Sequence, residues 1–188
     1  MDAKIKKYLD SSKIKYKLLP HRKVFTAFTA AETQHVDKRQ LVKVVLAKLS
    51  TPSVHLLKTG GPAELKFIFV AVPAGKRVNL KKVAKAINDH QEKSYKEILK
   101  LKAKIRPKKP SKITTKLASE KDIEKNLKTK IGLLHPFSHL FGLPILVDKK
   151  LTSNKKLIVS AGSYIESAEI STKDFLKQMQ GQLGNFTE

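Results

Sequence analysis

The chain has 188 residues, of which 40% are hydrophobic and 29% are charged. This length and this hydrophobic content are enough for one domain with a real core, and they exclude wholesale disorder. The 39 basic and 16 acidic residues give a net charge of +23, and the lack of cysteine excludes disulfides, thiol nucleophiles and thiolate metal sites.

The positive charge points first to a polyanionic partner, with nucleic acid ahead of an acidic membrane surface. Only four of the basic residues are arginines, and base-specific readout favours arginine, so the charge suits phosphate contacts better. Compositional drift in a lysine-rich proteome would explain the bulk of the charge equally well. The N-terminus lacks an apolar signal core and no stretch approaches 18 apolar residues, so we expect a cytoplasmic protein.

Short elements are predicted near the N-terminus. The apolar spacing of residues 2–10 predicts an amphipathic helix, and residues 14–19 alternate like a half-exposed strand that ends at Pro20. Thr29 is a candidate N-cap for a short helix, because Glu32 follows three residues later as in a capping box.

Two strands and a helix follow. Residues 42–49 and 65–72 are rich in β-branched and aromatic residues, which predicts two strands joined by an elaborated hairpin. Asn79 is a plausible N-cap for a helix over residues 79–89. From Lys93 to Lys116 there are ten basic residues and one acid, which indicates an exposed basic helix and linker.

Capped helices are predicted in the C-terminal half as well. Ser119 and Asp122 have the spacing of a cap before a short helix, and Ser171 caps a closing helix with Asp174 in its first turn. Because the predicted strands do not alternate strictly with helices, the pattern favours an α+β fold over a doubly wound sheet.

A glycine-proline loop lies between these two helices. Gly132 has no side chain, so its amide can approach a ligand closely, while Pro136 stiffens the loop by fixing its own φ. Residues 143–148 then predict a short buried strand, and residues 157–162 predict its pairing partner, which ends in a second glycine turn. Paired in this way, the strands would bring Gly132 and Gly162 to one site.

Several segments together resemble a known family. They are HRKVFTAFTAAE (21–32), KRQLVKVVLAK around Lys43, FVAVPAGKRVNLKKVAKAI, LASEKDIEK, GLLHPFSHLFGLPILVD, IVSAG and ISTKDFLKQM. In this order they are similar to the YbaK/EbsC type of aminoacyl-tRNA editing domain, which is related to the insertion domain of bacterial prolyl-tRNA synthetases. The most specific part is GxxxPF followed by FGLPILVD and a later SAG.

The resemblance implies a fold and an activity. The expected fold is a single α+β domain over residues 1–188, with a mixed, mostly antiparallel curved sheet or partial barrel flanked by helices. Residues 90–113 would be a basic helix and linker inserted in it. The expected activity is trans-editing: hydrolysis of the ester that joins a mischarged small amino acid to tRNA, with tRNA(Pro) as a candidate. No metal or cofactor is implied. Mischarged tRNA is the expected partner, an aminoacyl-tRNA synthetase is a candidate second one, and a monomer is favoured.

The resemblance also implies roles for individual residues. Lys43 and Gly132 would be catalytic, because Lys43 could polarise the ester or neutralise the terminal phosphate and the Gly132 loop could stabilise the developing negative charge. The expected substrate-binding residues are His21, Phe25, Thr26, Leu133, His135, Pro136, Phe137, Ser160, Ala161, Gly162 and Tyr164. Tyr164 stands where family members often have a histidine. The expected RNA-binding residues are Lys93, Lys96, Lys100, Lys104, Arg106, Lys108 and Lys109.

Other interpretations stay open. The chain could be a catalytically inactive RNA-binding protein with the same fold, or a membrane-surface protein using residues 93–112. Gly132 could be an ordinary turn glycine, and His21 could lie on the surface. A metal site at His135 and His139 is not expected, since they flank a proline loop and no HExxH motif is present. The chain also lacks G-x-S-x-G, GxxxxGK[ST] and GxGxxG motifs, which leaves serine hydrolases, nucleotide hydrolysis and dinucleotide redox chemistry unsupported.

Overall fold

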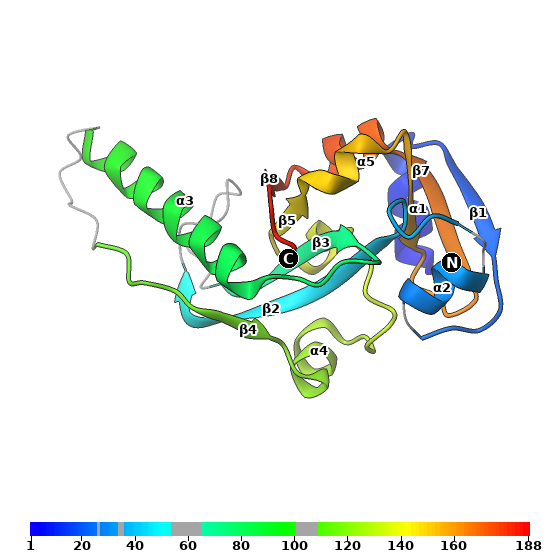
Figure 1. Ribbon diagram of the computed structural model, residues 1–188, viewed down its shortest axis with the longest axis horizontal. Helices are drawn as coiled ribbons and strands as arrows, with labels where there is room; N and C mark the ends of the chain where they lie inside the picture. The colour runs from blue at the N-terminus through cyan, green and yellow to red at the C-terminus, as the bar shows by residue number, and fades with distance from the viewer. Residues whose placement is uncertain (26, 34–35, 54–64, 101–108) are drawn as a thin grey trace.

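Two β-sheets meet along a seam in the computed structural model, which describes residues 1–25, 27–33, 36–53, 65–100 and 109–188 (Figure 1). The strands are β1 (Tyr16–Pro20), β2 (Val42–Ser53), β3 (Leu65–Pro73), β4 (Thr115–Leu117), β5 (Ile145–Asp148), β6 (Lys156–Ser160), β7 (Glu166–Ser171) and β8 (Gln182–Gly184). The larger sheet has the order β4-β2-β3-β5-β8 and the smaller has the order β1-β7-β6. A parallel bridge between Leu41 and Ile158 joins them.

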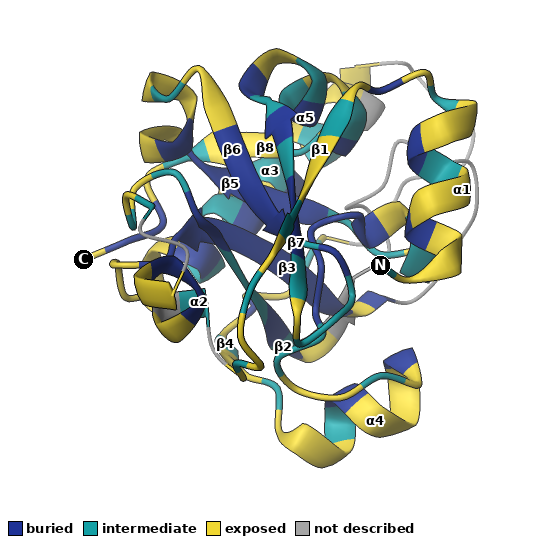
Figure 2. Cartoon of the chain, turned by 90° about the vertical axis from the view of Figure 1, so that its right-hand side faces the viewer, coloured by how far each residue is buried: buried dark blue, intermediate teal, exposed yellow. Residues whose placement is uncertain are grey.

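Helices pack against both sheets. They are α1 (Ala3–Ser11), α2 (Ala27–Thr33), α3 (Leu80–Lys100), α4 (Glu120–Leu127), α5 (Thr172–Met179) and the 3₁₀ turns η1 (Ser138–Phe141) and η2 (Lys149–Ser153). In Figure 1 the far end of α3 extends beyond the strands, while α1 and α2 lie beside the smaller sheet. Figure 2 shows that buried residues concentrate in the strands, whereas α4 is largely exposed.

The predicted α+β class with a mixed, mostly antiparallel sheet is confirmed. Strand β2 pairs antiparallel with β3 and β4, the smaller sheet is antiparallel throughout, and only β5 forms parallel pairs, with β3 and β8. The central strand β3 is buried at every position except Lys66 because sheet neighbours and helices cover it on all sides. Among the described residues the two sheets do not close into a barrel.

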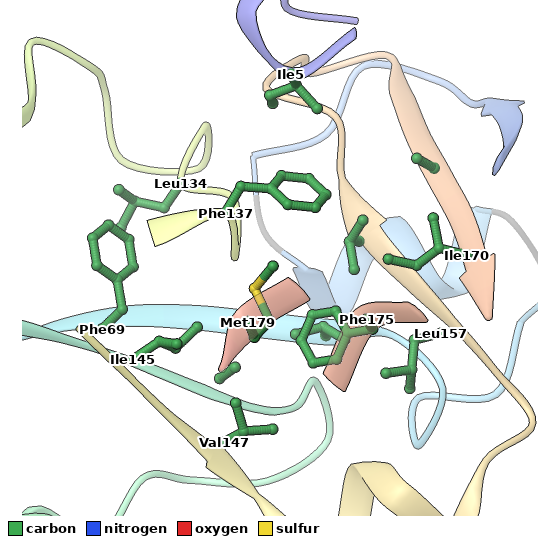
Figure 3. Close-up of a cluster of buried hydrophobic side chains, with 14 of the residues drawn as sticks. Ile5, Phe69, Leu134, Phe137, Ile145, Val147, Leu157, Ile170, Phe175 and Met179 are labelled. Atoms are coloured by element: carbon green, nitrogen blue, oxygen red, sulfur yellow. The ribbon is translucent and has the colours of Figure 1, made fainter. Parts of the chain in front are cut away.

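The main core lies between the larger sheet and the elements that cover it. Phe69, Phe137 and Phe175 are almost completely buried in this cluster, together with Leu134 and Met179 (Figure 3). These side chains come from β3, from the loop before η1 and from α5. The loop that begins at residue 131 is therefore anchored in the core directly after its glycine.

The pairing predicted for residues 157–162 is wrong. Strand β5 lies between β3 and β8, whereas β6 pairs with β7 in the other sheet. The connection explains the difference: Asp148 caps η2 by accepting from the Lys150 amide at 2.9 Å, and Leu151 is fully buried. This tight, anchored turn carries the chain from one sheet to the other instead of folding it back as a hairpin.

Two helix boundaries also differ from the predictions. Helix α2 begins at Ala27, so Thr29 lies inside it, and Glu32 forms an ion pair with Lys38 at 3.1 Å. Helix α3 continues without a break from Leu80 to Lys100. The helix predicted over residues 79–89 therefore runs on past residue 89, and Asn88 within it bonds the backbone N–H and C=O of Ile113 at 2.8 and 2.9 Å and so clamps the returning chain.

Candidate active site

A pocket of about 200 Å³ opens at the seam between the two sheets. Residues 42–45 of β2 form one wall, residues 21, 24, 25, 27 and 30 form a second, and residues 131, 132 and 134 form a third. Small and branched apolar side chains dominate the lining, including Val24, Ala27, Ala30, Leu41 and Leu134. Among the described lining residues, only His21 and Lys43 have ionisable side chains. A small, mostly apolar substrate group suits such a pocket.

The wall on β2 is a strand edge without a neighbouring strand. Strand β4 pairs with β2 only at residues 47–49, and β6 meets the chain at Leu41. The Leu41 carbonyl accepts from Ala74 on the β3 side, and the Leu46 carbonyl accepts from Ala118 on the β4 side. Since antiparallel strands alternate the direction of their hydrogen bonds, the N–H and C=O of Val44 point away from β3 and are available to a ligand.

Gly132 occupies a position that only glycine fits. Its φ is +86°, and a Cβ there would lie 2.6 Å from the Phe25 carbonyl oxygen and 3.2 Å from a Tyr164 ring carbon. No acceptor in the described part of the chain bonds the Gly132 amide. The pocket therefore contains an N–H group that is free to donate to a substrate oxygen.

The position of this loop is set by α4. Ser119 and Asp122 form the predicted capping box, and Asp122 also accepts from Lys48 of β2 at 2.7 Å. These bonds lower the pKa of the Asp122 carboxyl to about 2. Lys128 then ends the helix in the left-handed conformation and directs the chain into the pocket.

Lys43, the second residue of β2, lines the pocket. It lies opposite Val72 of β3, and its half-buried ammonium donates to the Lys76 carbonyl in the turn between β3 and α3. Burial and the nearby positive charge of Arg77 lower the pKa of Lys43. An anion bound beside the Lys43 ammonium would stabilise the charged form of this side chain.

Arg77 is a residue that the sequence analysis missed. Its guanidinium is exposed in the same turn and repels Lys43 electrostatically. The positive charges of Lys43 and Arg77 lie near enough to act on one another, an arrangement that suits a phosphate group. No sequence pattern pointed to Arg77, because its closeness to Lys43 depends on the pairing of β2 with β3.

A row of serine hydroxyls forms the polar side of the pocket. Ser160 lies at the end of β6, Ser163 in the following turn and Ser167 in β7, and all three line the cavity. The ring of His21 lies across from them, with Nε2 at 3.1 Å from Ser167 Oγ and Nδ1 at 2.8 Å from the Arg22 carbonyl oxygen. Ser163 and Ser167 were not among the predicted site residues.

Exposed apolar side chains surround the mouth of the pocket. Phe25 is 60% exposed and Ile131 and Ile165 are each 52% exposed, although large apolar residues are usually more covered. The Phe25 ring lies 5.0 Å from the ring of Tyr164, whose hydroxyl donates to the Ile131 carbonyl at 3.3 Å. Phe25 therefore lies at the rim and not in the core.

Comparisons with known proteins bear on the domain and its fold. Residues 108–178 match the family model of an aminoacyl-tRNA editing domain, a range that includes Gly132 and the serine row but not Lys43. A proposed trans-editing enzyme for prolyl-tRNA synthetase has a TM-score of 0.66 at 16% identity, over 100% of this chain and 99% of that chain. The chain has the fold of the YbaK-type editing domain, and residues 108–178 carry the sequence match to that domain.

Other solved structures share the fold of this editing domain. A hypothetical protein has a TM-score of 0.65 at 19% identity, over 98% of this chain and 99% of that chain. A structure from work on epitope grafting onto scaffold proteins has a TM-score of 0.68 at 16% identity, over 98% and 95% of the two chains. The comparison with curated proteins finds no match.

Several predicted substrate-binding residues of the editing domain lie beside the pocket and not in its lining. Pro136 and Phe137 are buried, and the ring of His135 stacks on Phe141 with centroids 4.8 Å apart. Burial lowers the pKa of His135 to about 4, and its Nδ1 has no hydrogen-bond partner within the part of the chain that the structure describes. Leu133 is half-buried next to Gly132. These residues support the loop from behind.

The second glycine turn packs against the first helix of the editing domain. The Ala161 carbonyl accepts from the Asp2 amide at 2.8 Å, and Asp2 in turn caps α1. A Cβ on Gly162 would lie 2.8 Å from the Asp2 Cβ and 3.0 Å from Ile5. Of the SAG sequence, only Ser160 lines the pocket.

The predicted RNA-binding residues lie far along the chain from the pocket walls. Lys93, Lys96 and Lys100 are exposed on α3, and Lys109 is exposed beyond it. Asp89, Glu92 and Glu97 alternate with the α3 lysines and share one shallow surface with them. The predicted residues Thr26, Lys104, Arg106 and Lys108 lie outside the described part of the chain.

Within the described residues, no group of three or more His, Asp or Glu side chains is arranged to hold a metal ion. None of the described helices is long and apolar enough to cross a membrane.

Proposed function

We propose that the protein is a free-standing, metal-independent deacylase that hydrolyses the ester of a mischarged small amino acid on tRNA. The free amide of Gly132 beside Lys43, in a pocket of about 200 Å³, is the observation that carries this proposal. The similar structure described as a trans-editing enzyme for prolyl-tRNA synthetase makes tRNA(Pro) the first candidate substrate. We expect the protein to act in the cytoplasm, where charged tRNA is used.

The free amide suits the chemistry of ester hydrolysis. Attack on the ester carbonyl places negative charge on its oxygen, and a donor already aimed at that oxygen stabilises the transition state more than the ground state. The Gly132 amide needs no rearrangement to donate, because φ and the Phe25 contact hold the loop in place. Lys43 and Arg77 would bind the phosphate before the terminal adenosine and so fix the ester in the pocket.

The pocket also suits the amino acid. None of the described lining residues is a carboxylate, so the α-ammonium group would bond the Val44 carbonyl on the free strand edge and the serine hydroxyls. Ala27 and Ala30 limit the space for the side chain to a small group. Long or aromatic amino acids would be rejected by their size.

The exposed rim would hold the end of the RNA. Bases at the 3′ end of tRNA are single-stranded, and aromatic rings such as Phe25 stack on unpaired bases regardless of their identity. The Lys23 ammonium lies 5.6 Å from the centre of the Phe25 ring and adds positive charge there. Farther away, Lys93, Lys96, Lys100 and Lys109 would contact backbone phosphates.

One alternative is a catalytically inactive RNA-binding protein with the editing-domain fold. The bond from the Lys43 ammonium to the Lys76 carbonyl favours it, because that bond occupies the group expected to act on the substrate. This alternative predicts strongly salt-dependent RNA binding without turnover.

A panel of mischarged tRNAs tests the proposal directly. We expect the wild type to release a small amino acid from at least one member, and Lys43→Ala to lower kcat/KM about 100-fold. Lys17→Ala, which removes an exposed lysine from β1, is the matched control and should keep the rate. RNA binding without deacylation of any member would support the inactive alternative, and adding a synthetase to the assay would reveal a second partner.

A further inference from the structure

The free amide of Gly132 belongs to the central peptide of a tight turn. The Leu133 amide donates to the Lys130 carbonyl at 3.1 Å, so residues 130–133 form a β-turn with Ile131 and Gly132 at its centre. The φ of Gly132 is +86°, whereas the φ of Ile131 is negative. A negative φ followed by a positive one defines a type II turn.

A type II turn has a close alternative. Rotation of its central peptide by about 150° or more gives a type I turn and keeps the bond between the first and fourth residues. Glycine allows both forms, because it adopts either sign of φ. In the type I form the Ile131 carbonyl would take the direction that the Gly132 amide has now, and its partial negative charge would repel the charge forming on the ester oxygen. The turn can therefore stabilise the transition state in only one of its two forms.

The hydroxyl of Tyr164 bonds the opposite side of this peptide. It donates to the Ile131 carbonyl oxygen, which can only accept, at 3.3 Å. The C=O and the N–H of one trans peptide point in opposite directions, so a donor that holds the Ile131 carbonyl also fixes the direction of the Gly132 N–H. A bonded carbonyl further polarises the peptide and strengthens its N–H as a donor.

Tyr164 is in turn held by the segment that forms another wall of the pocket. Its backbone carbonyl accepts from the Val24 amide at 2.9 Å, and its ring packs against the Phe25 ring with centroids 5.0 Å apart. A Cβ on Gly132 would lie 3.2 Å from a carbon of the Tyr164 ring, so the ring also approaches the turn closely. These contacts place the hydroxyl beside the turn.

We propose that the Tyr164 hydroxyl is a positioning group that keeps residues 130–133 in the type II form, with the Gly132 amide directed at the developing oxyanion. This role rests on the proposed deacylase activity and acts through the peptide, without contact to the reacting atoms. The distance of 3.3 Å is longer than the usual separation of about 2.7–2.8 Å between two bonded oxygens. Removal of the hydroxyl should therefore shift the turn without unfolding the protein.

NMR spectroscopy of the protein without substrate measures the form of the turn. The Ile131 Hα lies close to the Gly132 amide proton in a type II turn and far from it in a type I turn, so the NOE between these protons distinguishes the two. The wild type should give a strong NOE, and Tyr164→Phe, which keeps the ring, should give a weaker one. Tyr16→Phe removes a hydroxyl that donates to Asp10 at 3.1 Å, and this control should keep the strong NOE.

Deacylation of the best substrate from the tRNA panel measures the effect on catalysis. Tyr164→Phe should lower kcat about tenfold with an unchanged KM, as expected for the loss of one hydrogen bond that acts only on the chemical step. Tyr16→Phe should keep both constants. A proline followed by glycine favours the type II turn, so Tyr164→Phe should have little effect on kcat when it is made in the Ile131→Pro variant.

The outcomes separate the positioning role from the activity itself. A strong NOE in Tyr164→Phe, a loss confined to KM, or equal losses of kcat with isoleucine and with proline at position 131 would overturn the positioning role and leave the deacylase proposal intact. A wild type that deacylates no member of the panel would overturn the deacylase proposal, and with it the catalytic role of the turn.

Discussion

The pocket and the far end of α3 differ in almost every physical respect. Four separate chain segments line the pocket, and most of the lining is apolar. Of the described lining residues, only His21 and Lys43 have ionisable side chains. The far end of α3, residues 89–100, extends beyond the sheets and carries three lysines and three acids on its surface (Figure 1). Catalysis needs functional groups that are held in fixed positions in a volume shielded from water. Binding of the RNA phosphate backbone needs only accessible positive charge. The two regions should therefore respond differently to mutation.

Gly132→Ala should cause the largest loss of activity. The new Cβ would lie 2.6 Å from the Phe25 carbonyl oxygen at a φ of +86°, so the loop and its free amide must shift. Loss of one such donor lowers kcat about 100-fold or more. The rate on a minimal aminoacylated fragment and on whole tRNA should fall equally, since both use the pocket.

Gly142→Ala is a matched control for this change. Gly142 also has a positive φ, of +65°, but its Cβ would meet nothing within 4 Å. It should cost about 1 kcal/mol of stability and leave the rate unchanged. Equal losses of activity in the two variants would show that backbone strain, and not the position of the Gly132 amide, controls the rate.

Protonation of His135, which lies behind the pocket loop, should destabilise the folded protein at low pH. Burial lowers its pKa from 6.5 to about 4, so the unfolded chain binds a proton more readily than the folded one. The free energy of unfolding should therefore be highest above pH 6.5 and should fall by about 3 kcal/mol as the pH decreases toward 4. The free energy of unfolding, measured by denaturant titration between pH 7.5 and 4.5, should show this loss.

His135→Phe should remove that part of the pH dependence, since it keeps a ring against Phe141 and removes the unpartnered Nδ1. His90→Gln on α3 serves as the control and should unfold with the pH dependence of the wild type. An unchanged pH dependence in His135→Phe would contradict the assignment to His135.

The sequence predicted those features that depend on neighbouring residues. The caps at Ser119 and Ser171 each need only a partner three residues away, and both are present. The partner of β5 was mispredicted because strand pairing depends on distant segments. Arg77 and Ser167 were missed for the same reason: each meets its partner only after β2 and β3, or β1 and β7, have paired.

Phe25→Ala tests the exposed rim of the pocket. Loss of base stacking on an aromatic ring costs about 1–3 kcal/mol, so kcat/KM on whole tRNA should fall about tenfold. Phe25→Tyr keeps the ring and should keep the rate. A substrate that ends in an ester without a nucleobase should be cleaved equally by all three proteins. A similar loss on that substrate would instead place Phe25 in the amino acid pocket.

The smallest effect is expected from the lysines of α3. Replacing Lys93, Lys96 and Lys100 together by glutamine should weaken binding of whole tRNA only a few-fold, because Asp89, Glu92 and Glu97 already balance their charge. The slope of log affinity against log salt should fall by about 2, as expected when a few phosphate contacts are lost. Hydrolysis of a minimal fragment should not change.

The exposed lysines of α1, Lys4, Lys6 and Lys7, provide a triple control with the same change of net charge. If both triple variants weaken tRNA binding equally, general charge attracts the RNA and α3 has no special position. If the α3 variant alone lowers the salt slope, phosphates contact this helix directly. The lysines of α3 alternate with acidic residues at spacings that by themselves stabilise a helix by about 0.5 kcal/mol per pair. They could therefore serve the helix and not the RNA, and only the comparison of the two triple variants separates these roles.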